Sequence, residues 1–420
     1  MSSDTTIVLA VFSFKNIDFF MNNKVNRLIM LNQMAGPLFR ELAEDLSANF
    51  SKKSELYTGH PDTLAFIDKI DTLNITKAPL YNRKSKTTRI LSWLNYTFFA
   101  FFKIIFSPKG TLVLLVSNPP LLGPIALLLS KIRNLPYVIL IYDMYPDTMI
   151  SFGVLREDSI AVRVWRSINK HVWEGASAVY TIGDVMAEKL SQQFDVNKTR
   201  LKHVGVVPPW ADSENIRPIA KSSNPLAKEL DQLDCLTVLY SGNMGISHDI
   251  DSMLKAAKLL RHRADIKFLF IGEGEKWQPA YDFAESEGLA NVQVIPFQTE
   301  DRLPYTMALG DISLVALDKG AEGLMVPSKM YYYMAAGSAV IGICQGRNDL
   351  ALSLSMGDSG LTVLPGDYEK LAENILYLAN NPNKLQEFKD NARVSSITHF
   401  SRRACMKRFK ESLTSINLLP

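Results

Sequence analysis

The amino-acid sequence predicts an α/β protein with two doubly wound parallel-sheet domains that face each other across a cleft. Short runs rich in branched apolar residues alternate with longer amphipathic stretches, and turn residues stand at the junctions, as in βαβ units. The chain has 420 residues, whereas a single domain usually has about 100–200. Hydrophobic residues make up 47% of it and charged residues 21%, which is ordinary for a globular protein with an ample core.

In the first half, a strand is expected over 27–31, followed by a Gly-Pro turn at Gly36 and a helix over 38–46. Further strands of this half are expected over 111–116, 137–142, 179–182 and 201–207. The second half repeats the order with clearer junctions. Its strands are expected over 236–240, 267–271, 292–295, 311–317, 338–343 and 361–364. Its helices are expected over 249–261, from the loop at 272–275 to about 287, near 302–309, over 329–336 and over 368–379. A basic terminal helix is expected over 401–413.

A proline-rich stretch from Pro208 to Pro218 marks the expected domain boundary. It divides the chain into residues 1–215, residues 216–400 and a terminal helix within 401–420 that we expect to pack back towards the first domain. In parallel α/β sheets, ligands bind beyond the carboxyl ends of the strands, where the strand order reverses. Residues 1–25 precede the first expected strand and carry no functional prediction.

Charge and cysteine content exclude several classes of protein. Lysine and arginine total 46 against 43 acidic residues, and this balance does not favour a nucleic-acid binder, which usually has a basic excess. Cys235, Cys344 and Cys405 are far apart and odd in number, so we expect no disulfide framework and a reducing cytoplasm. The histidines show no ligand spacing, so no metal is expected.

Membrane-crossing segments are not expected from the sequence either. No basic region precedes the apolar stretch over 6–14, which argues against a secretory signal. A spanning helix needs about 20 apolar residues in a row. The longest candidate, 112–129, is interrupted at Asn118-Pro119-Pro120.

Two glycine loops follow expected strands in the second half. Gly242-Asn243-Met244-Gly245 lies between a strand and a helix, where glycine lets the backbone approach a diphosphate and the helix offers unpaired N–H groups. Gly272-Glu273-Gly274 has the same position in the next unit. The alternative interpretation is that both are simply tight strand-to-helix turns.

The segment over 326–337 is the most informative one. Pro327 stands at a helix entry, Ser328 at the expected N-cap and Gly337 just past the helix end. Lys329 lies beside this N-terminus, where a cation is unfavourable unless an anion is bound. Lys329 is therefore the first candidate for a phosphate ligand, and a solvated lysine is the alternative.

Asp143 ends an expected strand in the first half. A carboxylate at the carboxyl edge of a sheet can accept a proton from a substrate hydroxyl. An equally simple interpretation is a turn former or helix cap.

A basic cluster precedes an aromatic-rich helix between Arg83 and Phe106. Arg83, Lys84, Lys86 and Arg89 are followed by a tryptophan, a tyrosine and five phenylalanines. This combination is typical of an anchor at an anionic membrane surface. A core helix preceded by a solvated loop is the alternative.

The second half resembles the C-terminal domain of glycosyltransferase family 4, whose members are retaining enzymes with the GT-B fold. The matching segments are 240–245, 268–274, 327–337 and 360–367, and their order and spacing match over most of 205–415. In the first half, 32–46 and 117–147 are similar to the acceptor domain of that family. The pattern most resembles the branch that builds capsule, O-antigen and exopolysaccharide repeats.

The resemblance implies a nucleotide-sugar donor, a lipid-linked saccharide acceptor and no metal or other cofactor. The donor residues it implies are Gly242, Asn243, Met244, Gly245, His248, Gly272, Glu273, Gly274, Phe297, Glu322, Pro327, Ser328, Lys329 and Tyr332. Gly36, Asn118 and Asp143 are implied on the acceptor side. Same-face attack assisted by the leaving diphosphate is the implied mechanism.

The chain departs from the family at a pair of glutamates separated by seven residues. Tyr332 stands in the place of the second glutamate and Leu324 eight positions earlier, with Glu322 close but out of register. Asn243 replaces a frequent basic residue, and His248 stands near a second basic position. These departures leave the ribose contact open, and Glu322 is one candidate for it.

The sequence therefore favours a glycosyltransferase that uses a UDP- or GDP-sugar at the inner face of the cell membrane, as a peripheral cytoplasmic protein. A non-catalytic partner in a polysaccharide assembly complex and a GT-B nucleotide-sugar epimerase are the alternatives. A nicotinamide oxidoreductase is disfavoured because no G-x-G-x-x-G follows a strand. The sugar, the base, the linkage and the oligomeric state are not determined by the sequence.

Overall fold

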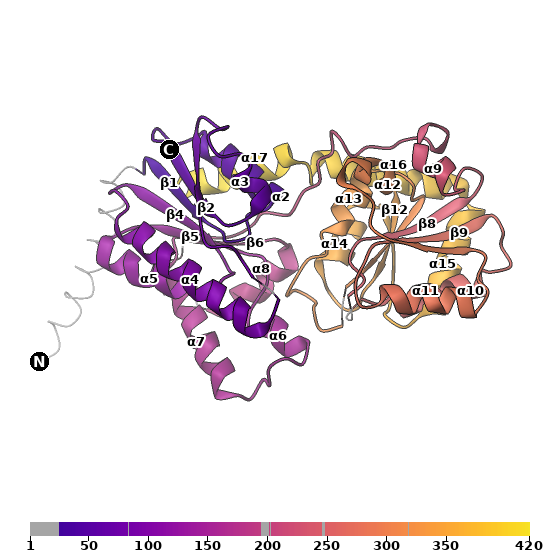
Figure 1. The fold of residues 1–420 in the computed structure, drawn as a ribbon, viewed down its shortest axis with the longest axis horizontal. Coiled ribbons are helices and arrows are strands. Elements are labelled where there is room, and N and C mark those ends of the chain that lie inside the picture. The colour runs from indigo at the N-terminus through magenta and orange to yellow at the C-terminus, as the bar shows by residue number, and fades with distance from the viewer. Residues whose placement is uncertain (1–24, 83, 195–200, 202, 246–247, 318) are drawn as a thin grey trace, which may run out of the picture.

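The computed structural model describes residues 25–420 except 83, 195–200, 202, 246–247 and 318. Within these residues, the chain forms two parallel sheets, one in each half (Figure 1). Both reverse their strand order once, so each has a switch point where loops from the carboxyl ends diverge. The predicted α/β class with two doubly wound sheets is confirmed.

The first sheet has seven strands. In their spatial order they are β3 (Leu73–Lys77), β2 (Ser54–Thr58), β1 (Arg27–Leu31), β4 (Thr111–Val116), β5 (Tyr137–Ile141), β6 (Ala178–Thr181) and β7 (Val204–Val206). The central strands β4 and β5 are buried at every position, as expected for a sheet covered on both faces. Its switch point lies between β1 and β4.

Strands β2 and β3 have no counterpart among the strands predicted from the sequence. β3 lies at the sheet edge and alternates buried with exposed side chains, so its polar residues hide the apolar pattern. Glu55 in β2 is a charged residue inside the sheet, and its carboxylate pairs with the ammonium of Lys103. Charged positions of this kind weaken the sequence signal of a strand.

Helices cover both faces of the first sheet (Figure 1). On one side lie α4 (Lys86–Ile105), α5 (Leu122–Arg133) and α7 (Ile160–Gly175). On the other side lie α2 (Pro37–Ser47), α3 (Pro61–Leu64) and α17 (Arg402–Ser415). The short helices α6 (Asp147–Ser151) and α8 (Asp184–Ser191) follow β5 and β6.

The second sheet has six strands. In their spatial order they are β10 (Val292–Ile295), β9 (Ile266–Ile271), β8 (Leu236–Ser241), β11 (Ile312–Ala316), β12 (Ala339–Ile343) and β13 (Gly360–Val363). Its helical elements are η2 (Lys221–Ser223), α9 (Pro225–Glu229), α10 (Ile250–Leu259), α11 (Trp277–Ser286), η3 (Glu300–Arg302), α12 (Leu303–Met307), α13 (Lys329–Ala335), α14 (Asp349–Gly357), α15 (Tyr368–Asn380) and α16 (Pro382–Thr398). The switch point lies between β8 and β11.

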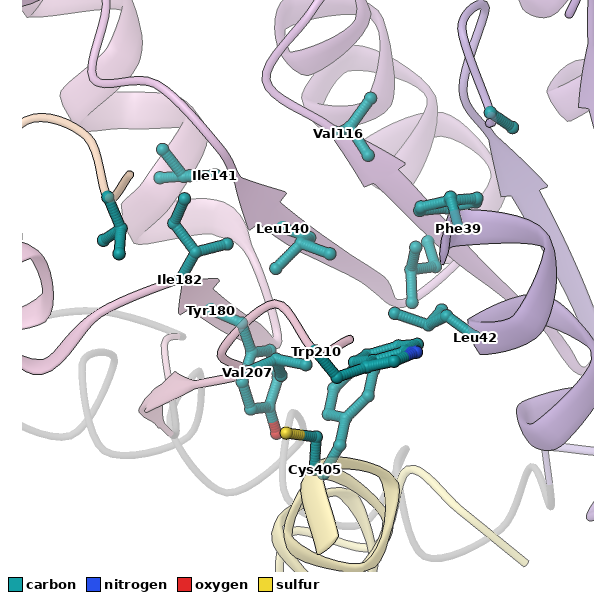
Figure 2. Close-up of a cluster of buried hydrophobic side chains, with 14 of the residues drawn as sticks. Phe39, Leu42, Val116, Leu140, Ile141, Tyr180, Ile182, Val207, Trp210 and Cys405 are labelled. Atoms are coloured by element: carbon teal, nitrogen blue, oxygen red, sulfur yellow. The ribbon is translucent and has the colours of Figure 1, made fainter. Parts of the chain in front are cut away.

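The connection between the halves is anchored in the first domain rather than exposed. Trp210 is only 2% exposed, and its indole N–H donates to the Glu41 carboxylate at 2.7 Å. Figure 2 shows Trp210 between Leu42 of α2 and Cys405 of α17. The backbone at Ala211 also forms a bridge with Ser401, just before α17.

Helix α17 belongs to the end of the chain yet packs on the first domain. The Phe409 ring contacts the Tyr180 ring edge-on, with centroids 4.7 Å apart. The Arg402 guanidinium binds the Asp45 carboxylate on α2, with a nitrogen–oxygen distance of 2.9 Å. The chain therefore crosses between the domains twice, once near Trp210 and once before α17.

A carboxylate links the two domains directly. Asp349, at the start of α14, accepts the backbone N–H groups of Val185 and Met186 at 2.9 and 3.2 Å. These groups open helix α8, so a side chain of the second domain caps a helix of the first. A Cβ on Gly183 would lie 2.3 Å from the Asp349 carboxyl carbon, so this contact requires glycine there.

Among the helices that the structure describes, none combines the length and apolar character that crossing a membrane requires.

Candidate donor site

The two glycine loops of the second domain lie against each other. A Cβ on Gly272 would lie 2.0 Å from the Gly242 carbonyl oxygen, and one on Gly274 would lie 2.7 Å from the Met244 carbonyl oxygen. The Met244 N–H donates to the Glu273 carbonyl at 2.7 Å, which ties the loops together. The glycines are therefore required by loop-to-loop packing, whatever ligand the loops also bind.

Lys329 extends from the start of α13 across the end of β8. Its ammonium donates to the Tyr240 hydroxyl at 2.5 Å and to the Asn243 carbonyl at 3.0 Å. It also lies 4.0 Å from the centroid of the Tyr240 ring. A Cβ on Gly242 would lie 2.5 Å from the Lys329 Cε, so the glycine makes room for this lysine. The structure thus places Lys329 at the first glycine loop, where the sequence predicted a phosphate ligand.

His248 joins the same group of polar atoms. Its Nδ1 lies 2.8 Å from the Asn243 carbonyl oxygen and 3.3 Å from the Gly245 backbone nitrogen. The Tyr240 hydroxyl donates to the Asn243 carbonyl at 2.8 Å. Lys329, Tyr240 and His248 therefore converge on one carbonyl oxygen at the rim of the loop.

A cavity of about 270 Å³ lies beside this group. It is lined by Ser241, Gly242, Ile271, Phe297, Gln298, Thr299, Glu300, Leu303, Thr306, Met307, Ser328, Lys329, Tyr332 and Tyr333. Five of the donor residues implied by the sequence meet here: Gly242, Phe297, Ser328, Lys329 and Tyr332. The cavity lies at the carboxyl ends of the strands, next to the switch point of the second sheet.

Ser328 stands at the N-cap position of α13 without acting as a side-chain cap. Its backbone is already helical, with φ −63° and ψ −23°, and its hydroxyl makes no cap hydrogen bond. The expected side-chain cap is therefore wrong, and the Ser328 side chain lines the cavity instead.

Tyr332 places a phenol where the family pattern has a glutamate. Burial raises the pKa of Tyr332, and the neighbouring carboxylates of Glu41, Asp212 and Glu300 raise it further. The hydroxyl is therefore protonated at neutral pH and can donate a hydrogen bond. It cannot supply the negative charge of the missing glutamate.

Glu300 is a cavity residue that the sequence reasoning missed. It begins η3 in the loop after β10 and lines the same cavity as Tyr332. The only sequence signal is its position three residues after Phe297, past the carboxyl end of a strand. An acidic residue is thus present at this cavity, on a different element from Tyr332.

Several implied donor residues do not line the cavity. The Met244 side chain is fully buried in the core of the second domain, which leaves only its backbone for a ligand. Asn243, Gly245, His248, Gly272, Glu273, Gly274 and Pro327 lie outside the cavity lining. The first six of these belong to or adjoin the paired glycine loops.

Glu322 lies at the contact with the first domain. Its carbonyl accepts a hydrogen bond from the Lys189 ammonium of α8 at 3.2 Å, and its Oε1 is buried without a hydrogen-bond partner. Leu324 is buried, and its carbonyl accepts the Met144 N–H at 3.3 Å. Glu322 is therefore not among the residues around Tyr332 in the donor cavity.

Asp143, which the sequence resemblance implies for the acceptor, follows β5 and lines a small cavity of about 40 Å³. Ser117, Tyr145, Trp165 and Asn169 line the same cavity. Burial raises the pKa of Asp143, so this carboxyl group binds a proton more tightly than an exposed one. A buried carboxyl group whose pKa is raised in this way is a candidate to exchange a proton with a ligand hydroxyl.

Asn118 and Gly36 flank the switch point of the first sheet. The Asn118 Oδ1 is buried without a hydrogen-bond partner, so it is available to a ligand donor. Gly36 is the N-cap residue before α2, and the nearest atom to a Cβ there is the His60 Nε2 at 3.6 Å. Neither residue lines the Asp143 cavity.

Within the described part of the chain, no group of three or more histidine, cysteine or acidic side chains is arranged to hold a metal ion.

The comparison with known protein families concerns the domain that holds this cavity. Residues 226–395 match the model described as "Glycosyl transferases group 1". The C-terminal domain is a group 1 glycosyltransferase domain. The resemblance seen in the sequence is confirmed at this level, and so is the expectation that the chain is a glycosyltransferase. Membership of family 4 and a retaining mechanism stay predictions.

Two curated relatives align with about two thirds of this chain and with about two thirds of their own length. The chain is 26% identical to the probable glycosyltransferase WbjE of Pseudomonas aeruginosa over 272 residues, which are 64% of this chain and 66% of WbjE. It is 25% identical to the putative colanic acid biosynthesis glycosyl transferase WcaI of Escherichia coli K12 over 282 residues, which are 66% of this chain and 69% of WcaI.

The fold of the whole chain is similar to that of solved GT-B structures. The crystal structure of HepE from Anabaena, in complex with UDP and glucose, matches with a TM-score of 0.68 at 13% identity. The match covers 93% of this chain and 100% of HepE. The group 1 domain therefore sits in a GT-B framework, with the other sheet facing it.

Proposed function

We propose that this protein is a retaining glycosyltransferase that moves a sugar from a UDP- or GDP-sugar to a lipid-linked saccharide. The product would enter the biosynthesis of a surface polysaccharide. The observation that carries the proposal is the cavity of the group 1 domain, where Lys329, Phe297 and Glu300 line one space. The printed names of WbjE and WcaI support the same class of reaction.

Lys329 is the proposed ligand of the donor diphosphate. Lys329 lines the cavity, and its ammonium lies beside Gly242, where the chain can approach a ligand closely. A lysine held by the Tyr240 ring and hydroxyl is positioned before a ligand binds, so less side-chain freedom is lost on binding. As the leaving group departs, this positive charge stabilises the developing charge on the diphosphate.

The base and ribose of the donor are proposed to lie against Phe297 and Glu300. Phe297 is exposed at the cavity and can stack on a nucleobase. Glu300 can accept hydrogen bonds from the two ribose hydroxyls, a role that the phenol at Tyr332 performs poorly. The donor carboxylate would thus come from η3 rather than from α13.

For the chemical step, we propose attack from the same face as the leaving group. The bond between the anomeric carbon and the diphosphate oxygen breaks, and a bond to the acceptor oxygen forms. The acceptor proton passes to the departing diphosphate. Asp143 is proposed to orient the acceptor hydroxyl, and Asn118 and Gly36 to line its approach.

The acceptor is proposed to reach the site from an anionic membrane surface. Helix α4 exposes a row of apolar side chains that includes Phe98, Phe99, Phe102 and Phe106. Most of the predicted anchor 83–106 thus forms a surface helix, and this helix exposes an apolar face to solvent. Attachment through this side would make the protein a peripheral one at the inner face of the membrane.

A non-catalytic partner in a polysaccharide assembly is the second candidate. The observation that favours it is the neutral, buried phenol of Tyr332 at the family's glutamate position. Such a protein would bind a nucleotide weakly or not at all. Donor binding therefore separates the two candidates.

The deciding experiment is a thermal-shift series with UDP, GDP, ADP and their sugars. A ligand that binds only the folded state raises the melting temperature with concentration. We expect a rise with one nucleotide family, lost in Lys329→Ala. Lys255→Ala is the matched control, because Lys255 also lies over a tyrosine ring, that of Tyr368, away from the cavity. A flat response with every nucleotide would support the non-catalytic partner.

A further inference from the structure

One surface of the first domain differs in charge from the rest of the chain. Helices α4, α5 and α7 together contain eight lysines and arginines and a single acidic residue, Glu174. Three of the eight form ion pairs: Lys103 with Glu55, Arg166 with Asp147 and Glu157, and Lys170 with Glu174. Basic residues still outnumber the acidic residues on or paired with these helices. The whole chain has 46 basic and 43 acidic residues, so outside these three helices the acidic residues predominate. The three helices lie on the same side of the sheet (Figure 1).

The same helices expose a large share of the apolar surface. Thirteen of the 27 exposed large apolar side chains among the described residues lie on α4, α5 and α7 or next to their ends. They are Ile90, Leu91, Leu94, Phe98, Phe99, Phe102, Phe106, Leu121, Leu128, Ile132, Ile160, Val164 and Ile168. Apolar and cationic side chains on one face fit a surface that is apolar within and anionic at its boundary, as a membrane leaflet is.

Between α5 and α7 this face contains a groove of about 280 Å³. Its lining consists of Pro124, Leu127, Leu128, Lys131, Ser167, Ile168, His171 and Val172. Most of these side chains are apolar, while Lys131 adds a positive charge. Such a lining fits a hydrocarbon chain, and Lys131 lies at the end of the groove away from the Asp143 cavity, where it can meet anionic headgroups.

The groove adjoins the cavity of Asp143. Pro124 and Val172 line both spaces, so these two side chains form a common wall. The helices approach closely there, because Gly123 has no Cβ that would meet Val172 Cγ1 at 2.8 Å. A chain in the groove would therefore lie directly beside the proposed acceptor position.

We propose that the α5–α7 groove binds the hydrocarbon chain of the acceptor lipid, with its phosphate end at the wall of Pro124 and Val172 beside the Asp143 cavity. This inference rests on the proposed lipid-linked acceptor. It adds a second contact to the membrane attachment through α4, because the groove selects the acceptor chain whereas the surface of α4 meets any anionic lipid.

Four observations support this proposal: the apolar lining of the groove, the exposure of its lining residues Leu128 and Ile168, the cationic excess of the three helices, and the wall shared with the Asp143 cavity.

The test uses Ser167→Trp, which fills the groove from an exposed position. Ala161→Trp adds the same indole to an exposed position of α7 outside the groove lining and is the matched control. The probe is undecaprenyl phosphate in uncharged detergent micelles, with phosphatidylglycerol and inorganic phosphate as competitors. Melting temperatures of both variants confirm that they are folded.

We expect Ser167→Trp to weaken binding of undecaprenyl phosphate by about tenfold or more, and Ala161→Trp to leave it unchanged. Binding to anionic vesicles and the nucleotide-induced thermal shift should be the same in both variants and the wild type. Three results would each contradict the proposal that the groove binds the lipid chain. Ser167→Trp could bind undecaprenyl phosphate as tightly as the wild type, or the wild type could fail to bind it. Phosphatidylglycerol or inorganic phosphate could also compete as well as undecaprenyl phosphate itself. Failure of the proposed function is distinct, since it appears as a missing nucleotide shift in the wild type.

Discussion

At the scale of single residues, the glycines of the donor loops are explained by packing before any ligand is considered. Gly272 faces the backbone of Gly242, and Gly242 faces the side chain of Lys329. Because Gly272 has no Cβ, the two loops can contact each other, and because Gly242 has none, the Lys329 side chain can lie against it. Together these contacts position the lysine at the cavity. The glycines at these positions are thus explained by contacts between the loops, and not by diphosphate binding alone.

Gly272→Ala is expected to separate the paired loops. Its Cβ would lie 2.0 Å from a backbone oxygen, which cannot move aside like a flexible side chain. We expect the free energy of unfolding to fall by about 1–3 kcal/mol and nucleotide binding to weaken. Chemical denaturation and a nucleotide titration measure both. Gly36→Ala is the control, because its nearest contact is an ordinary 3.6 Å.

Asp143→Asn is expected to change how stability depends on pH. Burial raises the pKa of Asp143 above the ordinary value of a carboxyl group. An unfolded aspartate titrates near about 3.9. The stabilising effect of the protonated carboxyl is therefore complete below that pH and is lost as the pH rises through the higher folded pKa.

The measurement is the melting temperature of Asp143→Asn minus that of the wild type, from pH 4 to pH 8. Asparagine stays neutral, so this difference should grow with pH. Burial also raises the pKa of Asp349, but that residue is present in both proteins and cancels in the difference. A difference that stays constant over the range contradicts the assignment.

At the scale of elements, two separate helical elements, η3 and α13, contribute residues to the same cavity. Tyr332 of α13 and Glu300 of η3 line the same cavity, although 32 positions separate them in the chain. The cavity could be seen only in the tertiary structure, whereas the amphipathic character of helix α4 is indicated by its sequence alone. This helix keeps Tyr96 and Ala100 in the core and turns Phe98 and Phe102 outwards.

Replacing Phe98 and Phe102 by serine is expected to reduce attachment to anionic vesicles. These side chains are 58% and 40% exposed, so their loss should leave the folded core intact. Each phenylalanine contributes about 1.5–3 kcal/mol when it is fully buried in an apolar phase. We expect vesicle co-sedimentation to fall at least about tenfold.

The matched control replaces Tyr377 and Val394 by serine. These side chains have similar exposure but lie on α15 and α16 of the second domain. Their loss should leave vesicle binding unchanged. If both double variants bind vesicles equally, attachment does not use α4.

At the scale of the whole molecule, the two domains are held by a few defined contacts. Asp349 caps α8, the Lys189 ammonium reaches the Glu322 carbonyl, and α17 returns the end of the chain to the first domain. The capping carboxylate is buried, so its hydrogen bonds to α8 have no competing solvent nearby. Its loss leaves two N–H groups at the helix start without that partner.

Asp349→Ala is expected to loosen the relative placement of the domains. An unsatisfied buried donor costs about 1–3 kcal/mol, so the melting temperature should fall. Small-angle X-ray scattering should show a larger radius of gyration than that of the wild type. Arg347→Ala is the control, since its ion pair with Glu188 is exposed and contributes at most about 1 kcal/mol. An unchanged radius in Asp349→Ala would mean that the cap does not hold the domains together.

The sequence predicted the buried strands well, because residues such as those of β4 are apolar at almost every position. It did not reveal β2 and β3, whose polar residues face an edge or an ion pair. For the candidate site, the sequence singled out Lys329 and Gly242, and the structure places both at one cavity. It did not single out Glu300, which lines the same cavity, because the sequence of a short loop does not indicate which cavity its residues line.

By itself, the sequence determined the α/β class, the order along the chain of every strand except β2 and β3, the glycine loops and the amphipathic helix α4. These follow from local patterns of polarity and from backbone conformations that few residues can adopt. Only the tertiary structure decided that Glu300 and Tyr332 line one cavity, that Asp349 caps a helix of the other domain, and that α5 and α7 form a groove beside Asp143. These contacts join residues far apart in the chain, and their positions depend on how whole elements pack rather than on any local pattern.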